Sequence, residues 1–286
     1  LPSPTCLPVL PPSPPRKGLQ HSGHRQGPSV LSAAFASPLM RLPSPTCTSV
    51  TRDVVVPGLQ LIEDFLSASE QEALRSAIDE RWGTESITRR RTQHYGYAFC
   101  YASKSVDISK RVGDLPPMFD GLLSKIRLAG LPLDDTDQIT VNEYNVGEGI
   151  GCHIDTHSAF EDAIGTLSLG SGCVMEFRRR AAADDSPQPC DRKLLYLTKG
   201  SLLIFKGEAR YAWAHYIASR RTDCVDGRIL KRGRRVSVTL RKVRGCSCEC
   251  SWPSVCDTQN PSSLELPTRL PAHKTQTDGV TDGGRG

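Results

Sequence analysis

The stretch Arg235-Val-Ser-Val-Thr-Leu-Arg241 decides the fold class, because apolar and polar side chains alternate along it. In an extended strand its three aliphatic residues lie on one face, and its arginines, serine and threonine lie on the other. The stretch Gln138-Ile-Thr-Val-Asn-Glu-Tyr144 alternates in the same way, with Asn142 and Tyr144 on its polar face. Either strand alone could expose its polar face to solvent. Two such strands in one domain also suggest inward polar faces that line a pocket for a charged small molecule.

Other short β-type runs surround these two strands, and turns that contain glycine separate many of them. The runs cover residues 54–56, 59–62, 163–169, 173–178, 193–197 and 201–205. The predicted strand that begins at Arg235 extends to residue 243. Ser67 and Glu70 form a capping-box pattern in front of a helix predicted over residues 71–81. Many short strands beside few helices predict a mainly β domain with flanking helices, of the sandwich or barrel type.

The 286-residue chain divides into three segments by composition. Residues 1–52 hold 11 of the 21 prolines, repeat the hexapeptide Leu-Pro-Ser-Pro-Thr-Cys and contain no acidic residue, so we predict a disordered tail. Residues 53–257 carry the strand patterns and are predicted to form a single α+β domain. Residues 258–286 are polar, with several glycines and prolines, and we predict a second flexible tail there.

Charge and cysteine content exclude several classes of protein. The chain has 36 Lys and Arg against 31 Asp and Glu, and residues 1–52 hold the whole excess. The folded part is therefore neutral and would bind nucleic acid only through a local basic patch. No apolar run approaches the roughly 18 residues of a membrane-spanning helix. Eleven cysteines without a secretory leader indicate a reducing compartment, the cytoplasm or nucleus or both, and the acid-free start leaves organelle import as an alternative.

The run Cys-His-Ile-Asp-Thr-His at residues 152–157 has the clearest metal-binding pattern. His153 and Asp155 are two residues apart in an extended segment, so both side chains can reach one ion from the same side. Two histidines and one carboxylate are the ligands of non-haem Fe(II) oxygenases, which leave coordination positions open for reactants. The alternative is a hydrogen-bonding pair at the surface.

Spacing does not fix the third ligand, since His94, His157 and His215 are all candidates. His157 lies only two residues beyond Asp155, too near to approach the ion from a separate strand. His215 precedes the arginine-bearing strand, so a neighbouring strand can bring it to the metal, and we prefer it. His94 follows a run of arginines and is predicted to lie on the substrate side.

A basic stretch interleaved with aromatic residues, residues 89–99, is the best candidate for contact with nucleic acid. Arginines suit phosphates, and aromatic rings suit stacking on an unpaired base. The alternative is an exposed turn followed by an ordinary aromatic strand. The candidate substrate residues are Arg89, Arg90, Arg91, His94, Tyr95 and Tyr97.

A cysteine cluster occupies residues 246–256. Four cysteines in so short a segment, in a chain without secretory features, are typical of a zinc site, because thiolates bind Zn²⁺ tightly and tetrahedrally. The spacing is not that of a standard zinc finger. Three cysteines would supply ligands, and the fourth ligand would be Cys246 or a histidine of the barrel. A reduced, unstructured tail is the alternative.

These patterns together resemble the AlkB family of Fe(II)/2-oxoglutarate dioxygenases. The resemblance rests on residues 142–162, residues 168–171, the pair Arg235 and Arg241, and the cysteine cluster. It covers about residues 53–258 and is strongest to the branch that hydroxylates a modified wobble uridine in tRNA. It implies a double-stranded β-helix, or jelly roll, with a small C-terminal zinc site.

The resemblance also implies the ligands of each cofactor. The implied Fe(II) ligands are His153, Asp155 and His215, and the implied Zn(II) ligands are His157, Cys248, Cys250 and Cys256. This assignment leaves Cys246 without a role. The implied contacts of 2-oxoglutarate are Arg235 to its distal carboxylate, with help from Asn142 and Tyr144, while Arg241 would steady Asp155 or the carboxylate next to the metal.

The resemblance makes a tRNA wobble-uridine hydroxylase that uses molecular oxygen and 2-oxoglutarate the expected function. The alternatives are an AlkB-type demethylase of N-alkylated bases and a non-catalytic, zinc-stabilised RNA-binding module. Animal members of the branch carry an RNA recognition motif upstream and a methyltransferase domain downstream, and the sequence contains neither pattern. We therefore expect either a fragment of a larger protein or a division of functions with a separate tRNA methyltransferase.

Overall fold

The structure is a computed structural model and describes residues 56–82, 86–87, 90–179 and 192–265. All of these residues fall within one compact unit of the chain, Thr46–Gly286. Arg89, the tail predicted over residues 1–52 and most of the tail predicted over residues 258–286 lie outside the described residues, as do residues 54 and 55. The described part contains no helix that is both long and apolar enough to cross a membrane.

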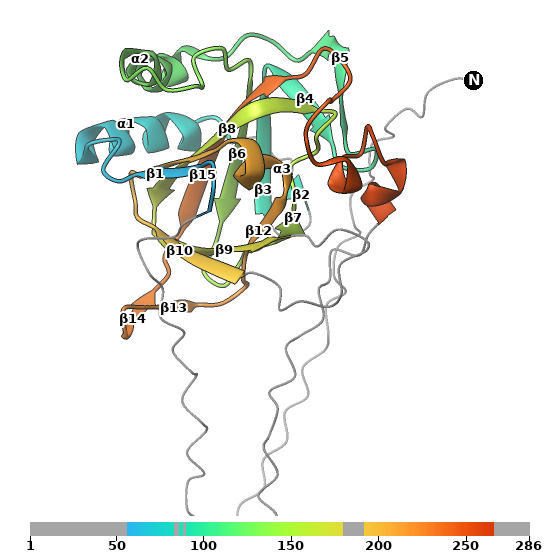
Figure 1. The fold of residues 1–286 in the computed structure, drawn as a ribbon. Coiled ribbons are helices and arrows are strands. Elements are labelled where there is room, and N and C mark those ends of the chain that lie inside the picture. Colours follow the sequence, from blue (N-terminus) through green and yellow to red (C-terminus); the bar gives the residue numbers. More distant parts are fainter. Residues whose placement is uncertain (1–55, 83–85, 88–89, 180–191, 266–286) are drawn as a thin grey trace, which may run out of the picture. The chain divides into compact units, whose positions relative to one another are not determined.

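Two antiparallel sheets form the body of the domain (Figure 1). The larger sheet has the strand order β1-β11-β8-β15-β6-β3-β2, and the smaller has the order β10-β9-β12-β7. The strands are β1 (Leu59–Ile62), β2 (Ser86–Ile87), β3 (Arg90–Tyr95), β4 (Tyr97–Cys100), β5 (Ser105–Arg111), β6 (Gln138–Tyr144), β7 (Ile150–His153), β8 (Phe160–Gly170), β9 (Cys173–Arg179), β10 (Arg192–Leu197), β11 (Leu202–Phe205), β12 (Trp213–Ile217), β13 (Thr222–Val225), β14 (Arg228–Lys231) and β15 (Arg235–Val243). The predicted mainly β architecture is confirmed.

Few helices accompany the sheets, and the first begins at the predicted capping box. The Ser67 hydroxyl accepts a hydrogen bond from the Glu70 amide at 3.3 Å, and the Glu70 carboxylate accepts one from the Ser67 amide at 2.7 Å. The helix therefore begins directly after Ser67, three residues earlier than predicted. The helices are α1 (Ala68–Asp79), α2 (Asp120–Leu128) and α3 (Gly207–Tyr211), with 3-10 turns η1 (Pro117–Phe119), η2 (Pro253–Val255) and η3 (Pro261–Glu265).

The two faces of the larger sheet have different neighbours. The apolar face of β15 packs in a core cluster that also contains Ile78 of α1 and Ile126 of α2. The register places Arg235 of β15 opposite Tyr144 of β6, so the polar faces of these strands lie side by side. Both line a cavity together with residues of the smaller sheet. Inward polar faces are therefore the correct interpretation, because α1 and α2 cover the apolar face.

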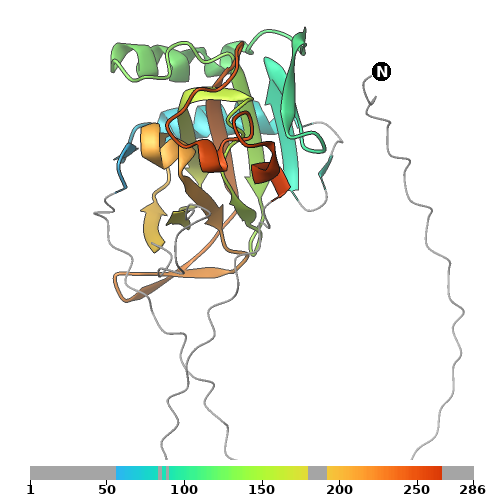
Figure 2. The same ribbon diagram turned by 45° about the vertical axis from the view of Figure 1, so that its right-hand side comes forward.

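A second apolar cluster combines residues of both sheets. Its largest members are Phe160, Phe177, Phe205 and Trp213. The C-terminal segment packs beside α3 (Figure 2). There Trp252 stacks on Tyr211, with ring centroids 5.5 Å apart. Cys248 and Cys256 are buried in the same small cluster as these two rings.

Candidate active site

Three metal-ligand side chains converge where β7 meets β12. His153 of β7 and His215 of β12 are cross-strand partners, and their ring centroids are 4.4 Å apart. Asp155 follows β7 by two residues, and all three side chains line one small cavity. His153 Nδ1 donates a hydrogen bond to the Gly151 carbonyl at 2.8 Å, so Nε2 is the nitrogen that can serve as a metal ligand.

The charge states of this triad suit a divalent cation. Burial would raise the pKa of Asp155, but Arg241 and the two histidines outweigh it and hold that pKa well below its usual range. Arg241 Nη2 donates to Asp155 Oδ1 at 2.9 Å. Burial and the neighbouring His153 lower the pKa of His215 to about 3. The cavity therefore offers an ionised carboxylate and neutral imidazole, which are the protonation states that metal ligation requires.

Arg235 lies in the same cavity and is an unpaired buried cation. Its Nη2 donates to Ser168 Oγ at 2.9 Å, and its guanidinium lies over the Tyr144 ring at 5.4 Å. Its Nε is buried without a hydrogen-bond partner, and within the described ranges no carboxylate forms an ion pair with it. Burying a guanidinium with so few partners costs free energy unless an anion pairs with it and accepts its remaining hydrogen bonds. The arrangement therefore fits the carboxylate of a small acid.

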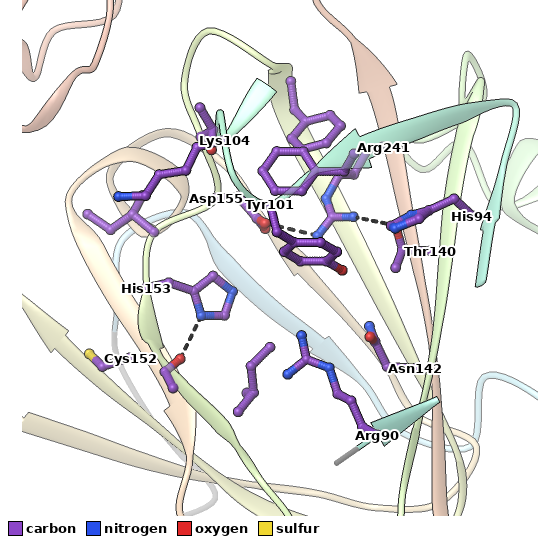
Figure 3. Close-up of a pocket in the computed structure, with 16 residues that line it drawn as sticks. Arg90, His94, Tyr101, Lys104, Thr140, Asn142, Cys152, His153, Asp155 and Arg241 are labelled. Carbon is purple, nitrogen blue, oxygen red and sulfur yellow. Dashed lines mark hydrogen bonds and ion pairs between the residues drawn. The ribbon is translucent and has the colours of Figure 1, made fainter. Parts of the chain in front are cut away.

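A larger cavity of about 340 Å³ opens on the other side of the triad (Figure 3). The two cavities share Asn142, Ile150, His153, Asp155 and Arg241. The lining of the larger cavity also includes Arg90, His94, Phe99, Tyr101, Lys104 and Thr140. Its volume lies within the range of small-ligand pockets. A ligand in this cavity would therefore lie directly against the triad.

His94 presents a neutral ring to the larger cavity. Burial, with smaller effects of Arg241 and Arg90, lowers the pKa of His94 to about 4. Its Nδ1 lies 3.0 Å from Thr140 Oγ1. Its Nε2, like Arg90 Nε, is buried and has no hydrogen-bond partner among the described residues. Both nitrogens are therefore open to polar atoms of a ligand.

Three of the predicted substrate residues do not line the larger cavity. Arg91 forms an ion pair with Glu143 and lies over the Trp82 ring at 4.7 Å. Tyr95 is buried in the core against Phe119, with ring centroids 5.2 Å apart. Tyr97 packs with the second apolar cluster and does not line the larger cavity. Strand alternation is the reason for the first two, because Arg91 and Tyr95 share one face of β3 and Arg90 and His94 share the other.

The predicted zinc ligands form a second convergent group. The ligand atoms of His157, Cys248, Cys250 and Cys256 all lie within 4.8 Å of one another. Cys250 Sγ is 3.4 Å from His157 Nδ1. Burial lowers the pKa of His157 to about 4, so its ring is neutral. The cluster could hold a metal ion, and exposed Cys246 lies outside it.

Sequence reasoning missed several residues around the triad. Tyr101 and Lys104 lie in the turn between β4 and β5, directly after the aromatic run of the sequence, which was the available signal. Thr140 lies on the polar face of β6 and accepts a hydrogen bond from Arg241 Nη1 at 3.1 Å, so the alternation of that strand could have identified it. Arg210 contacts the triad segment only through long-range hydrogen bonds to its backbone, and no local pattern marks it.

Comparison with known proteins agrees with this geometry. Residues 58–241 match the family profile of the 2OG-Fe(II) oxygenase superfamily. The chain is 43% identical over 244 residues to a protein of Arabidopsis thaliana named Alkylated DNA repair protein ALKBH8 homolog, covering 77% of this chain and 70% of that one. It is 39% identical over 238 residues to tRNA (carboxymethyluridine(34)-5-O)-methyltransferase ALKBH8 of Macaca fascicularis, covering 75% of this chain and 34% of that one. It is 27% identical over 207 residues to DNA N6-methyl adenine demethylase of Caenorhabditis elegans, covering 70% and 65%.

The cofactors of this superfamily fit the residues present. The chain spans about a third of the macaque protein, and the matched residues include the triad and the arginine-bearing strand. Two imidazoles and a carboxylate are the donor set for Fe(II), and the unpaired Arg235 fits a carboxylate of 2-oxoglutarate. The chain therefore belongs to the AlkB family of the 2OG-Fe(II) oxygenase superfamily, close to ALKBH8, and is a 2-oxoglutarate- and Fe(II)-dependent dioxygenase.

Proposed function

We propose that this dioxygenase hydroxylates a 5-carboxymethyl-type uridine at the wobble position of tRNA. The observation that carries the proposal is the larger cavity, which meets the triad and combines aromatic rings with cationic side chains. Tyr101 and Phe99 offer surfaces for stacking on an unpaired base. Arg90 and His94 offer buried nitrogens without partners to the oxygen atoms of that base. The name of the macaque relative also refers to carboxymethyluridine 34 of tRNA.

In this proposal, each residue around the triad has a distinct role. His153, Asp155 and His215 hold Fe(II), which with 2-oxoglutarate and molecular oxygen supplies the oxidising chemistry. Arg235 binds the distal carboxylate of 2-oxoglutarate bidentately, beside Asn142 and Tyr144. Arg241 orients the Asp155 carboxylate from outside the metal's ligand set. The protein thus positions the reactants and keeps the ligands in their required charge states.

A second candidate, oxidative demethylation of N-alkylated bases, uses the same site. Hydroxylation of a carbon bonded to nitrogen gives a hemiaminal, which collapses and releases formaldehyde. Hydroxylation of a carbon with only carbon neighbours, such as the methylene of a 5-carboxymethyl group, leaves a stable alcohol. The Caenorhabditis elegans relative, named as a demethylase, is the observation in favour of this candidate. A third candidate, a non-catalytic RNA-binding module, does not agree with the convergent triad and Arg235.

The decisive test is mass spectrometry of tRNA nucleosides after incubation with Fe(II), 2-oxoglutarate and ascorbate. With tRNA that carries a 5-carboxymethyl-type wobble uridine, we expect that nucleoside to gain the mass of one oxygen atom. His153→Ala should abolish the gain. Release of formaldehyde from N-methylated oligonucleotides, without any gain on the uridine, would instead establish the demethylase. Because the substrate is itself a modified base, we propose a separate tRNA methyltransferase as a partner that supplies the ester form.

We further propose that the cysteine cluster binds one structural Zn(II) through His157, Cys248, Cys250 and Cys256. Four converging donors and a buried neutral imidazole support this assignment. The site would fasten the C-terminal segment, which has few buried apolar residues of its own, to the segment after β7.

Replacing Cys256 with serine should abolish this binding. We expect the zinc content, measured by elemental analysis, to fall from stoichiometric to undetectable, and the midpoint of thermal unfolding to fall with it, because metal binding contributes directly to folding. Cys246→Ser is the matched control, since Cys246 is exposed and lies outside the cluster. Equal zinc contents in the two variants would refute the assignment.

A further inference from the structure

The segment between β7 and β8 carries residues of both candidate metal sites. Asp155 of the triad and His157 of the cysteine cluster lie two residues apart in it, and neither belongs to a strand. Backbone carbonyls in such a segment have no partners in a sheet. Where they are buried, other groups must supply their hydrogen bonds.

Arg210 of α3 donates hydrogen bonds to two carbonyls of this segment and to two more at the start of β8. Its side chain is buried, with 3% exposure. Its guanidinium donates to the carbonyl oxygens of Asp155 at 2.6 Å, Thr156 at 3.0 Å, Phe160 at 3.2 Å and Glu161 at 3.3 Å. Across the described ranges no carboxylate forms an ion pair with this arginine. The planar fork of a guanidinium can hold several carbonyls in fixed positions at once, and the single, freely rotating ammonium group of a lysine does not reproduce that arrangement.

Other groups hold the cysteine-cluster side of the same segment. Asp257 Oδ1 accepts hydrogen bonds from the amides of His157 at 2.9 Å and Ser158 at 3.1 Å. Arg244 Nε donates to the His157 carbonyl at 3.0 Å. Tyr211, next to Arg210 in α3, meets the His157 ring edge-on with centroids 4.9 Å apart. A shift of His157 would therefore disturb both α3 and the carbonyls that Arg210 holds.

We propose that Arg210 is a positioning residue that couples the two metal sites. Arg210 fixes the backbone of Asp155, while Arg241 of β15 fixes the carboxylate of the same residue. The coupling rests on the zinc site proposed above, because bound zinc holds His157 and thereby the other half of the segment. By linkage, zinc raises the affinity of the triad for its metal, and the triad metal raises the affinity for zinc by the same factor.

Binding of Mn(II) to the full-length chain tests this proposal without any nucleic-acid substrate. Mn(II) prefers oxygen and imidazole ligands, so it reports on the triad and not on the thiolates. The Kd follows from the electron paramagnetic resonance signal of free Mn(II), measured with zinc bound and after its removal by a chelator. In the wild type, we expect zinc removal to weaken Mn(II) binding about tenfold. In Arg210→Lys we expect binding about tenfold weaker even with zinc bound, and little further loss when zinc is removed.

Arg232→Lys is the matched control. Arg232 is also buried, but it binds Asp223 and the Ala218 carbonyl, away from the segment after β7, so wild-type coupling should remain. If circular dichroism shows that Arg210→Lys is unfolded, Asp257→Ala takes its place. Loss of the Asp257 carboxylate loosens the same segment on the side of the cysteine cluster. We expect the zinc-dependent change in the Kd for Mn(II) to be smaller in Asp257→Ala than in the wild type.

Three results would overturn all or part of the proposal. An unchanged Mn(II) affinity in folded Arg210→Lys would show that Arg210 does not position Asp155. The same zinc-dependent change in the wild type and in Arg210→Lys, or none in the wild type, would show that the sites are not coupled through this segment. A wild type that contains no zinc would refute the zinc site and the coupling. The comparison of Arg210→Lys with the wild type would still decide whether Arg210 positions Asp155.

Discussion

Replacing Arg235 with methionine should raise the KM for 2-oxoglutarate by about 30-fold to 4,000-fold, because removing one partner of a buried charge pair costs about 2–5 kcal/mol. Arg235 is a buried cation in the smaller cavity, and among the described residues no carboxylate forms an ion pair with it. Methionine keeps much of the side-chain volume but cannot bind the distal carboxylate of the co-substrate. The measurement is succinate formation as a function of 2-oxoglutarate concentration.

Arg234→Met is the matched control for this substitution. Arg234 precedes Arg235 in the chain but pairs with Asp79 and Glu143 at a partly exposed position. Its loss should lower the free energy of unfolding and leave the KM for 2-oxoglutarate unchanged. A KM that rises in both variants, or in neither, would contradict the assignment of Arg235.

Alternation along single strands predicted much of the fold. The observed bounds of β6 and β15 match the sequence pattern, because both faces of each strand have a distinct character. Alternation did not show which face points inward, since that depends on where α1 and α2 pack. The helix α2 was missed because it is short and no side chain caps its N-terminus.

The iron site shows the same division between local and long-range information. The spacing of His153 and Asp155 is local and was visible in the sequence. The third ligand depends on the pairing of β12 with β7, which no spacing specifies. Arg90 and Arg91 are neighbours in sequence, yet one lines the larger cavity and the other pairs with Glu143. Side chains alternate between the two faces of a strand, so recognising β3 as a strand would have placed Arg90 and Arg91 on opposite faces. The run of arginines alone did not distinguish them.

Replacing His153 with alanine should reduce succinate formation to the rate of Fe(II) in buffer. The two histidines and Asp155 are the only metal-type ligands that line the smaller cavity among the described residues, so loss of one leaves too few ligands to hold the ion. The smaller side chain leaves the β7–β12 pairing intact, and circular dichroism should show a folded protein. Glu148→Gln, in the turn before β7, is the control and should retain the wild-type rate.

Absorption spectroscopy without oxygen tests most directly the claim that one cavity brings together the triad and Arg235. When a 2-oxo acid chelates Fe(II), a visible charge-transfer band arises. The wild-type chain with Fe(II) and 2-oxoglutarate should develop this band, His153→Ala should not develop it, and Arg235→Met should need far more 2-oxoglutarate to reach it. A band of full intensity in His153→Ala at the wild-type concentration of 2-oxoglutarate would contradict this account of the site.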